Sequence, residues 1–321
     1  LIAALATLTI DYVIMAMAET FWVLLVGRVL AGVAGATYIT ATAYIADIAR
    51  PQERGAAFGM IGAAFGIGFV LGPALGGMAS AWHIAAPFWI AAALSALNVA
   101  FGLFILPESL KPENRRPFGK RDLNPFGTIA RSFAIPGLAI PLVCIFVFEF
   151  ANMVYPALWA FWGREVFGWD GFTIGLTLSA YGVLIAVVQA GLLPRLTRHL
   201  GDHRTLLIAI IASVVGLLGY GFANAIWVVA VFLPIAALSD MAPPLLSAFA
   251  ANRVGEDQQG LVQGVIASLS SVSAVLAPLL LTGVFERFVR GDLIYLPGAP
   301  FLVAALLVIA IVPLIWRLGK S

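Results

Sequence analysis

Long runs of apolar residues constrain this chain more than any other feature. Between polar breaks the runs last roughly 18 to 27 residues, and an α-helix needs about 20 residues to cross a bilayer. They lack the alternation of apolar and polar residues that marks the strands of a membrane β-barrel. Of the 321 residues, 62% are hydrophobic and 11% are charged, whereas about a quarter of the residues in soluble domains are charged. The sequence therefore predicts an all-α integral membrane protein.

The polar breaks divide the sequence into ten predicted membrane helices. Their predicted bounds are 1–18, 21–47, 54–80, 86–106, 137–162, 171–195, 204–222, 226–250, 260–284 and 296–316. Leu1 already lies within an apolar run, with no signal-peptide pattern before it. We therefore expect the sequence to begin in the middle of a longer protein.

The placement of lysine and arginine predicts the orientation in the membrane. One set of alternate loops, together with the C-terminal tail, holds fourteen of the 18 basic residues: Arg50, Arg54, Lys111, Arg115, Arg116, Lys120, Arg121, Arg131, Arg195, Arg198, Arg204, Arg253, Arg317 and Lys320. The opposite loops hold Arg164, Arg287 and Arg290. We therefore expect the C-terminus to be cytoplasmic. The net charge of +2 reflects this topology, and we expect no nucleic-acid partner.

An internal repeat predicts two related halves. ERGAAFGMIGAAFGIGFVLGP at 53–73 aligns with QQGLVQGVIASLSSVSAVLAP at 258–278, and APFW at 86 aligns with APFL at 299. The third and fourth predicted helices thus repeat as the ninth and tenth, whereas the fifth and sixth have counterparts only upstream of Leu1. The parent protein is predicted to have twelve helices in two pseudo-symmetric six-helix bundles. The predicted domains are an incomplete N-terminal bundle at 1–106, a cytoplasmic loop at 107–134 and a C-terminal bundle at 135–321.

Several motifs resemble the major facilitator superfamily, and within it the drug/proton antiporter branch around the tetracycline efflux pumps. They are IDYVIMA, LLVGRVLAGVAGATYITATAYIADI, PQERGAAFG, LGPALGG, ALNVAFGLFILPESLK, NPF, PALW and QGLVQG, so the resemblance covers essentially the whole chain. It implies two membrane bundles that alternate access to a central site. In the family's numbering the ten helices would be helices 3 to 12.

A proline lies among glycines in one predicted helix. LGPALGG resembles the family's antiporter motif, which here comprises Gly68, Gly72, Pro73, Gly76 and Gly77. Gly62, Gly66, Gly68, Gly72 and Gly76 give this helix small residues at four-residue spacing, which lets a facing helix approach closely. We expect Pro73 to bend this helix and the glycines to form a sliding contact between the halves. Tight packing without a transport role is the alternative.

Charges near the cytoplasmic helix ends are predicted to anchor the loops. Asp47 and Glu53 lie beside Arg50 and Arg54, and PRLTRHLGDHR at 194–204 resembles a second copy of the family's loop signature. The predicted cytoplasmic gate therefore consists of Asp47, Arg50, Glu53, Arg54, Arg198, Asp202 and Arg204.

Charges inside the membrane are expensive unless they are paired or hydrated, so they are candidate functional groups. Glu149 and Asp240 lie well inside predicted helices with no basic residue within a turn, and we expect both to face a cavity. A desolvated carboxylate without a cationic partner can take up and release a proton. We predict that one of them, with Glu149 as the first candidate, carries a coupled proton and that a cationic drug competes with it for the site. The alternative is a protonated side chain that only holds helices together.

Asp11 and Arg28 lie at equal depth on either side of a predicted helix turn, so they are expected to share a polar network. Asp11 is a further candidate for proton coupling, and Arg28 resembles the family's helix 4 arginine, which projects toward the cavity. Three polar residues are predicted to line the substrate cavity with Arg28, although each could instead join helices: Asn152, Tyr181 and Gln189.

Other chemistries find no support in the sequence. His83, His199 and His203 are predicted in loops and form no ligand cluster, and Cys144 is the only cysteine. Neither a dinucleotide fingerprint nor a phosphate-binding loop occurs. We expect no cofactor, no metal and no enzymatic activity, and protons as the driving ion.

The predicted function is efflux of a drug-like molecule of multidrug or tetracycline type in exchange for protons. The expected setting is a monomer in a bacterial inner membrane. An uptake symporter or facilitator with the same fold is one alternative, and a non-transporting sensor or scaffold is another. Related tetracycline pumps usually carry a histidine where Ile185 falls and an aspartate where Ser213 falls. These departures leave the drug itself open.

Overall fold

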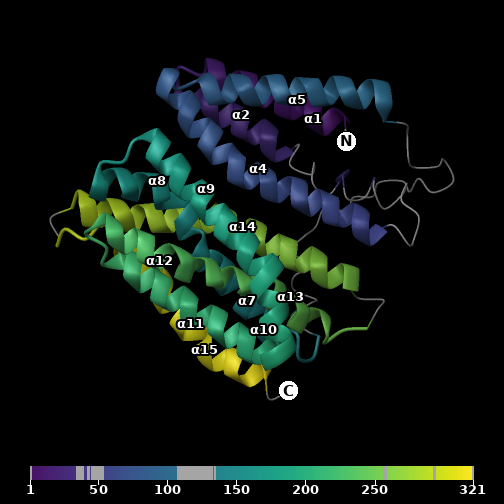
Figure 1. Cartoon of the computed structure of the whole chain (residues 1–321), viewed down its shortest axis with the longest axis vertical. Helices are drawn as coiled ribbons and strands as arrows, with labels where there is room; N and C mark the ends of the chain where they lie inside the picture. Colours follow the sequence, from purple (N-terminus) through teal and green to yellow (C-terminus); the bar gives the residue numbers. More distant parts are fainter. Residues whose placement is uncertain are drawn as a thin grey trace. The chain divides into compact units, whose positions relative to one another are not determined.

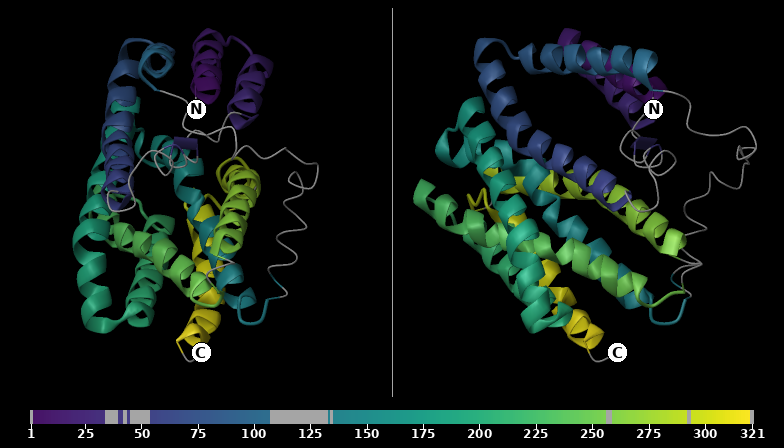
Figure 2. Two further views of the ribbon diagram at one scale, coloured as in Figure 1. Left: turned by 90° about the vertical axis from the view of Figure 1, so that its right-hand side faces the viewer. Right: turned by 45° about the vertical axis from the view of Figure 1, so that its right-hand side comes forward.

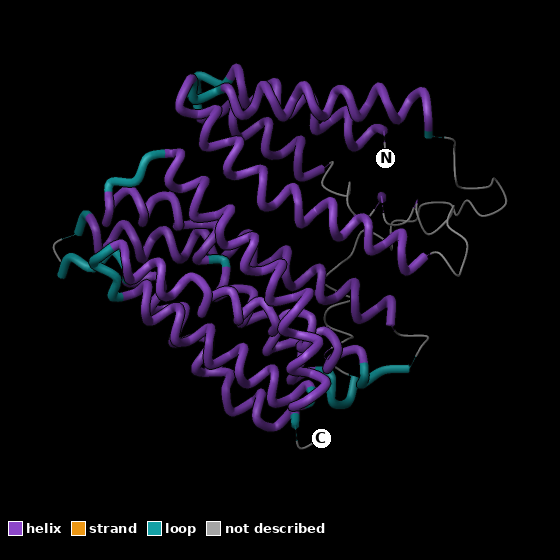
Figure 3. The backbone as a smooth tube through the Cα atoms, in the orientation of Figure 1, coloured by secondary structure: helices purple, strands orange, loops and turns teal. Residues whose placement is uncertain are grey.

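The computed structural model of the protein describes residues 2–33, 40–41, 44, 54–106, 133, 135–255, 259–291 and 294–319. Every regular element in these ranges is helical, as the tube in Figure 3 shows. The all-α prediction is therefore confirmed. Figure 1 labels the helices along the chain.

Each of the ten predicted membrane spans contains an apolar helix in the described part of the chain. Within the described ranges, seven segments are long and apolar enough to cross a bilayer: Ala86–Ile105, Ala139–Phe167, Gly171–Leu200, Asp202–Gly221, Ile226–Ala251, Leu261–Val289 and Ala299–Leu318. Three shorter apolar helices, Ile2–Met17, Phe21–Gly32 and Gly66–Trp82, overlap the first three predicted spans. Many of their large apolar side chains are exposed, as expected for a surface that faces lipid.

The helices group into two compact units. The first comprises the described residues of Leu1–Pro117 together with Gly171–Ala180. Its helices are α1 (Ile2–Met17), α2 (Phe21–Val33), α4 (Arg54–Trp82) and α5 (Ala86–Ile105), with the first ten residues of α9 (Gly171–Val187). Helix α1 packs against α2 and α5, as both views of Figure 2 show. The Thr9 hydroxyl on α1 donates to Ser95 Oγ on α5 at 2.9 Å.

The second unit comprises the described residues of Phe118–Asp170 and Tyr181–Ser321. Its elements are α7 (Ala139–Asn152), α8 (Val154–Phe167), the rest of α9, η3 (Val188–Leu192), α10 (Leu193–Leu200), α11 (Asp202–Gly221), α12 (Ile226–Leu238), η4 (Ser239–Met241), α13 (Ala242–Ala251), α14 (Gln259–Val289) and α15 (Ala299–Leu318). Helix α11 packs against α12 and α15, and α7 packs against α14 and α15. Leu206, Leu217 and Phe301 are among the completely buried side chains of this core.

Three membrane spans of the second unit are interrupted, which the sequence analysis did not predict. The breaks fall at Met153 between α7 and α8, at the π-helical η3, and at the 3₁₀-helical η4. Proline explains each of them, because proline has no N–H for the carbonyl four residues earlier. Pro156, Pro194 and Pro244 leave the carbonyls of Asn152, Ala190 and Asp240 without that partner.

Two histidine predictions were wrong. His199 lies in α10 and His203 in the first turn of α11, because the polar stretch around them continues as helix on both sides of Gly201. Gly201 has a positive φ of 78°, a conformation that glycine adopts readily, and it forms the corner between α10 and α11. His83 does lie between helices, as predicted.

Candidate functional site

The three breaks of the second unit bring together the polar residues that the sequence placed on separate helices. Glu149 is on the last turn of α7, and Asp240 is at the centre of η4. Both side chains are partly buried. Broken membrane helices expose backbone carbonyls near side chains that hold ions or substrates in several transporter folds. This cluster is therefore the candidate functional site.

Asp240 is held by two residues of the adjacent span. The Tyr181 hydroxyl on α9 donates to Asp240 Oδ2 at 2.6 Å. Gln189 Nε2 on η3 donates to the backbone oxygen of Asp240 at 3.4 Å. Because Pro244 cannot donate to that oxygen, Gln189 supplies the hydrogen bond that the broken helix lacks.

Glu149 has a different environment. It is close enough to Asp240 for the two carboxylates to interact electrostatically. Within the described part of the chain, no lysine or arginine forms an ion pair with either acid. Asn152 Nδ2 donates to the Phe148 carbonyl, one turn earlier in the same helix, at 2.9 Å. Two neighbouring carboxylates without a paired cation make a site that favours protons or a cationic ligand.

Aromatic side chains surround this site, and the sequence analysis missed most of them. The ring of Tyr155 stacks on Tyr181 with centroids 6.3 Å apart and meets Tyr220 edge-on at 5.9 Å. The Tyr155 and Tyr220 hydroxyls are buried and have no hydrogen-bond partner among the described residues. Tyr155 could have been suspected from its position one residue before Pro156, where α8 starts. Nothing in the sequence singled out Tyr220.

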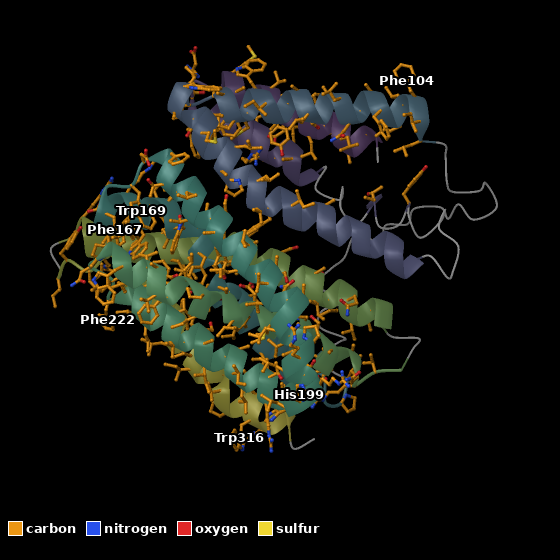
Figure 4. All side chains as sticks on the ribbon, viewed as in Figure 1. Phe104, Phe167, Trp169, His199, Phe222 and Trp316 are labelled. Atoms are coloured by element: carbon orange, nitrogen blue, oxygen red, sulfur yellow. The ribbon has the colours of Figure 1, made fainter. Side chains whose placement is uncertain are left out.

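The aromatic cluster extends toward one end of the second unit through Trp159, Trp162, Trp169 and Phe301. Figure 4 shows Phe167, Trp169 and Phe222 at this end, whereas His199 and Trp316 lie at the opposite end. Aromatic side chains at both ends of the span match the aromatic belts of membrane proteins. The end with His199 and Trp316 also carries Arg198 and Arg317, next to them in the sequence.

In the first unit, Asp11 and Arg28 form an ion pair between Oδ2 and Nη2, so the predicted pairing is confirmed. Asp11 is completely buried, whereas the Arg28 side chain is 52% exposed. The second carboxylate oxygen, Asp11 Oδ1, is buried without a partner among the described residues. Gly27 allows this arrangement, because a Cβ there would lie 2.9 Å from Asp11 Oδ1.

The close helix contact of the first unit lies at two residues of the predicted antiporter motif, Gly77 and Pro73. A Cβ on Gly77 would lie 2.6 Å from the Gly171 carbonyl oxygen, and one on Gly175 would strike the Pro73 carbonyl. By contrast, a Cβ on Gly66, Gly68, Gly72 or Gly76 would meet no described atom within 4 Å. Within this unit, α4 therefore approaches α9 through Gly77 and Pro73. The sliding contact between the halves stays a prediction. The spacing fits close approach, but it does not say which face meets a partner.

The predicted gate residues are only partly described. Asp47, Arg50 and Glu53 lie outside the described residues, as does the side chain of Arg54. Arg198 is in the last turn of α10, while Asp202 and Arg204 are in the first turn of α11. None of these three forms an ion pair with another described residue. Their role in a gate stays a prediction.

Comparison with known proteins gives a family match over most of the chain. The model of the Major Facilitator Superfamily matches residues 1–278. A class C tetracycline resistance protein of Escherichia coli is 35% identical over 89% of this chain and 72% of the relative. A class G tetracycline resistance protein of Vibrio anguillarum is 33% identical over 94% of this chain and 79% of the relative.

Solved structures share the fold at lower identity. The nucleoside transporter NupG, as its D323A mutant, matches with a TM-score of 0.78 and 15% identity over 99% of this chain and 82% of that one. The human organic anion transporter MFSD10 matches with a TM-score of 0.68 and 22% identity over 98% of this chain and 76% of that one. At these identities the likeness concerns the fold alone.

Proposed function

The chain belongs to the Major Facilitator Superfamily of membrane transporters, and from this we propose that it exports a drug-like small molecule in exchange for protons. Relatives named for tetracycline resistance, at 28 to 35% identity, support export of a drug. The single observation that carries the proton coupling is the placement of Glu149 and Asp240. Both acids lie at helix breaks of one unit, and neither is paired with a described basic residue.

Each acid has a role in this proposal. Glu149 has no hydrogen bond to the Tyr181 hydroxyl that holds Asp240, so it is the freer of the two and carries the transported proton. Asp240 sets the charge of the site. When both acids are ionised, their repulsion favours a cation between them, either a proton or a cationic drug. Competition between the two cations exchanges drug for proton without nucleotide hydrolysis.

The ligand in this proposal is a cationic or zwitterionic aromatic molecule. Stacked Tyr155 and Tyr181 next to the acids offer a flat aromatic surface and negative charge together. Aromatic faces attract cations by about 0.5 to 2 kcal/mol, depending on desolvation. Arg28 remains a candidate for the cavity of the first unit.

In the proposed setting, the basic loops support the orientation, and the bacterial tetracycline resistance relatives support the kind of membrane. The protein lies in the inner membrane of a bacterium with its C-terminus in the cytoplasm, and it works as a monomer without a cofactor. In inverted membrane vesicles the cytoplasmic face is outward, so a supplied drug should drive protons out of acidified vesicles.

Drug-dependent proton flux from such vesicles tests the function. The full-length protein is screened against cationic and zwitterionic drugs, with vesicles that lack the protein as the control. We expect at least one drug to dissipate the proton gradient in a saturable manner. A saturable solute flux that runs inward with protons would favour an uptake symporter, and the absence of flux with every drug would contradict the antiporter.

A further inference from the structure

One neighbouring span, Gly171–Leu200, donates hydrogen bonds to both the side chain and the main chain of Asp240. Tyr181 donates to the carboxylate at 2.6 Å, and Gln189, about two turns later, donates to the backbone oxygen at 3.4 Å. The two contacts differ in chemistry. Tyr181 donates to the carboxylate, which is the group that ionises. Gln189 donates only to a backbone oxygen of η4. Removing one at a time therefore separates an electrostatic role from a structural one.

Few other ionisable groups face Asp240. Of the elements that pack against η4, helices α12 and α13 and the η3 segment carry no ionisable side chain. Helix α11 contributes Tyr220, and its Asp202, His203 and Arg204 lie in the first turn, at the other end of the helix. Helix α8 contributes Tyr155, and α7 contributes Glu149.

The hydroxyl of Tyr181 stands apart from the other two tyrosine hydroxyls. Those of Tyr155 and Tyr220 are buried without a hydrogen-bond partner among the described residues. Tyr181 donates directly to the carboxylate at a distance typical of strong O–H···O⁻ hydrogen bonds. A donor of this kind stabilises the ionised form of the acid. Once the acid takes up a proton it becomes a donor itself, and the tyrosine hydroxyl has to accept or turn away.

We propose that Tyr181 is a positioning residue that holds Asp240 in its ionised form and so keeps the second acid of the site negatively charged. Its meaning for transport rests on the proposed function, but the effect on Asp240 does not. Negative charge at Asp240 retains a proton on Glu149 until a cationic ligand replaces it. Because Tyr181 belongs to α9, protonation of Asp240 would also loosen the hold of this helix on η4.

Infrared spectroscopy of the full-length protein in lipid nanodiscs tests this directly. The protonated carboxyl band is followed across pH, and the part that disappears in Asp240→Asn is assigned to Asp240. In Tyr181→Phe we expect the midpoint of this band to move toward alkaline pH by about 1 to 2 units, the worth of a hydrogen bond to a charged group. An unchanged midpoint in Tyr181→Phe would overturn the proposal, as would an Asp240 that is protonated throughout in the wild type.

Two matched variants control for structural effects. Gln189→Leu removes the contact to the backbone of η4, and Tyr220→Phe removes a buried hydroxyl without a described partner. Both are expected to leave the Asp240 midpoint in place. A shift in either as large as that of Tyr181→Phe would contradict the assignment to Tyr181.

A second substitution covers the possibility that Tyr181→Phe does not fold. 3,5-Difluorotyrosine at position 181 keeps the ring and makes the hydroxyl a stronger donor, so the midpoint should move toward acidic pH. An alkaline shift, or none, would overturn the proposal. The spectra need no drug and no flux. A failed vesicle assay would therefore count against the proposed function alone, and an unchanged midpoint against Tyr181 alone.

Discussion

At the scale of single residues, the ion pair of Asp11 and Arg28 is asymmetric. The carboxylate is completely buried, while half of the arginine side chain is exposed. An isolated buried charge is far more costly than an exposed one, since water can solvate only the latter. Loss of either partner should therefore have unequal effects, although both break the same contact.

We predict that Arg28→Gln lowers stability more than Asp11→Asn does. The glutamine variant leaves a buried carboxylate without its cation, at roughly 1 to 3 kcal/mol, whereas the freed arginine can turn to water or lipid head groups. The double variant should recover most of the loss. Unfolding midpoints of the purified variants in one detergent measure this. Equal losses in the two single variants, or additive losses in the double, would show that the pair is not coupled as the geometry indicates.

The sequence predicted the pairing of residues on consecutive helices. It did not predict a contact that depends on how distant helices pack. Asp11 and Arg28 lie on consecutive helices, so equal distances from the turn place them at one depth. Tyr181 and Asp240 are 59 residues apart. Their contact depends on how α9 meets η4, and no spacing in the sequence encodes that meeting.

At the scale of helices, the contact of α4 with the start of α9 depends on which glycine faces the partner. Gly76 and Gly77 are neighbours in one helix, yet they point to different sides. A Cβ on Gly77 would meet the Gly171 oxygen at 2.6 Å and Phe172 Cα at 3.2 Å, whereas one on Gly76 meets no described atom within 4 Å.

The adjacent glycines provide a matched test. We expect Gly77→Ala to destabilise the protein by about 1 to 3 kcal/mol, because backbone atoms cannot yield to the added methyl group. Gly76→Ala should be neutral or stabilising by up to about 1 kcal/mol, the difference in helix propensity. Thermal unfolding midpoints of the two variants check this. Equal sensitivity at the two positions would mean that the contact does not lie at Gly77.

The length of the apolar runs predicted the membrane helices, but it did not predict the breaks inside them. Each of the ten predicted spans contains an apolar helix in the described residues, and seven of these segments are long enough to cross a bilayer, because roughly 20 apolar residues can satisfy their backbone in lipid only as a helix. The breaks at Met153, η3 and η4 were missed, although Pro156, Pro194 and Pro244 follow them within a few residues. A proline does not by itself tell whether a helix continues, as α4 does through Pro73, or is interrupted.

At the scale of the whole molecule, the proposed proton coupling depends on the two acids of the second unit. The family match places the chain among transporters, but it does not say which residues take the proton. Glu149 and Asp240 are the described acids that lie at helix breaks in this unit without a described cationic partner. If they merely joined helices, a neutral amide of the same shape would serve equally well, since it can also make hydrogen bonds.

Uphill drug export by Glu149→Gln and Asp240→Asn in the full-length protein is the measurement that tests proton coupling most directly. Glu286→Gln, the same change at an exposed position on α14, is the control. We predict that Glu149→Gln abolishes export against a drug gradient while drug binding persists, that Asp240→Asn weakens export, and that Glu286→Gln exports normally. Undiminished proton-driven export in both Glu149→Gln and Asp240→Asn would contradict the assignment.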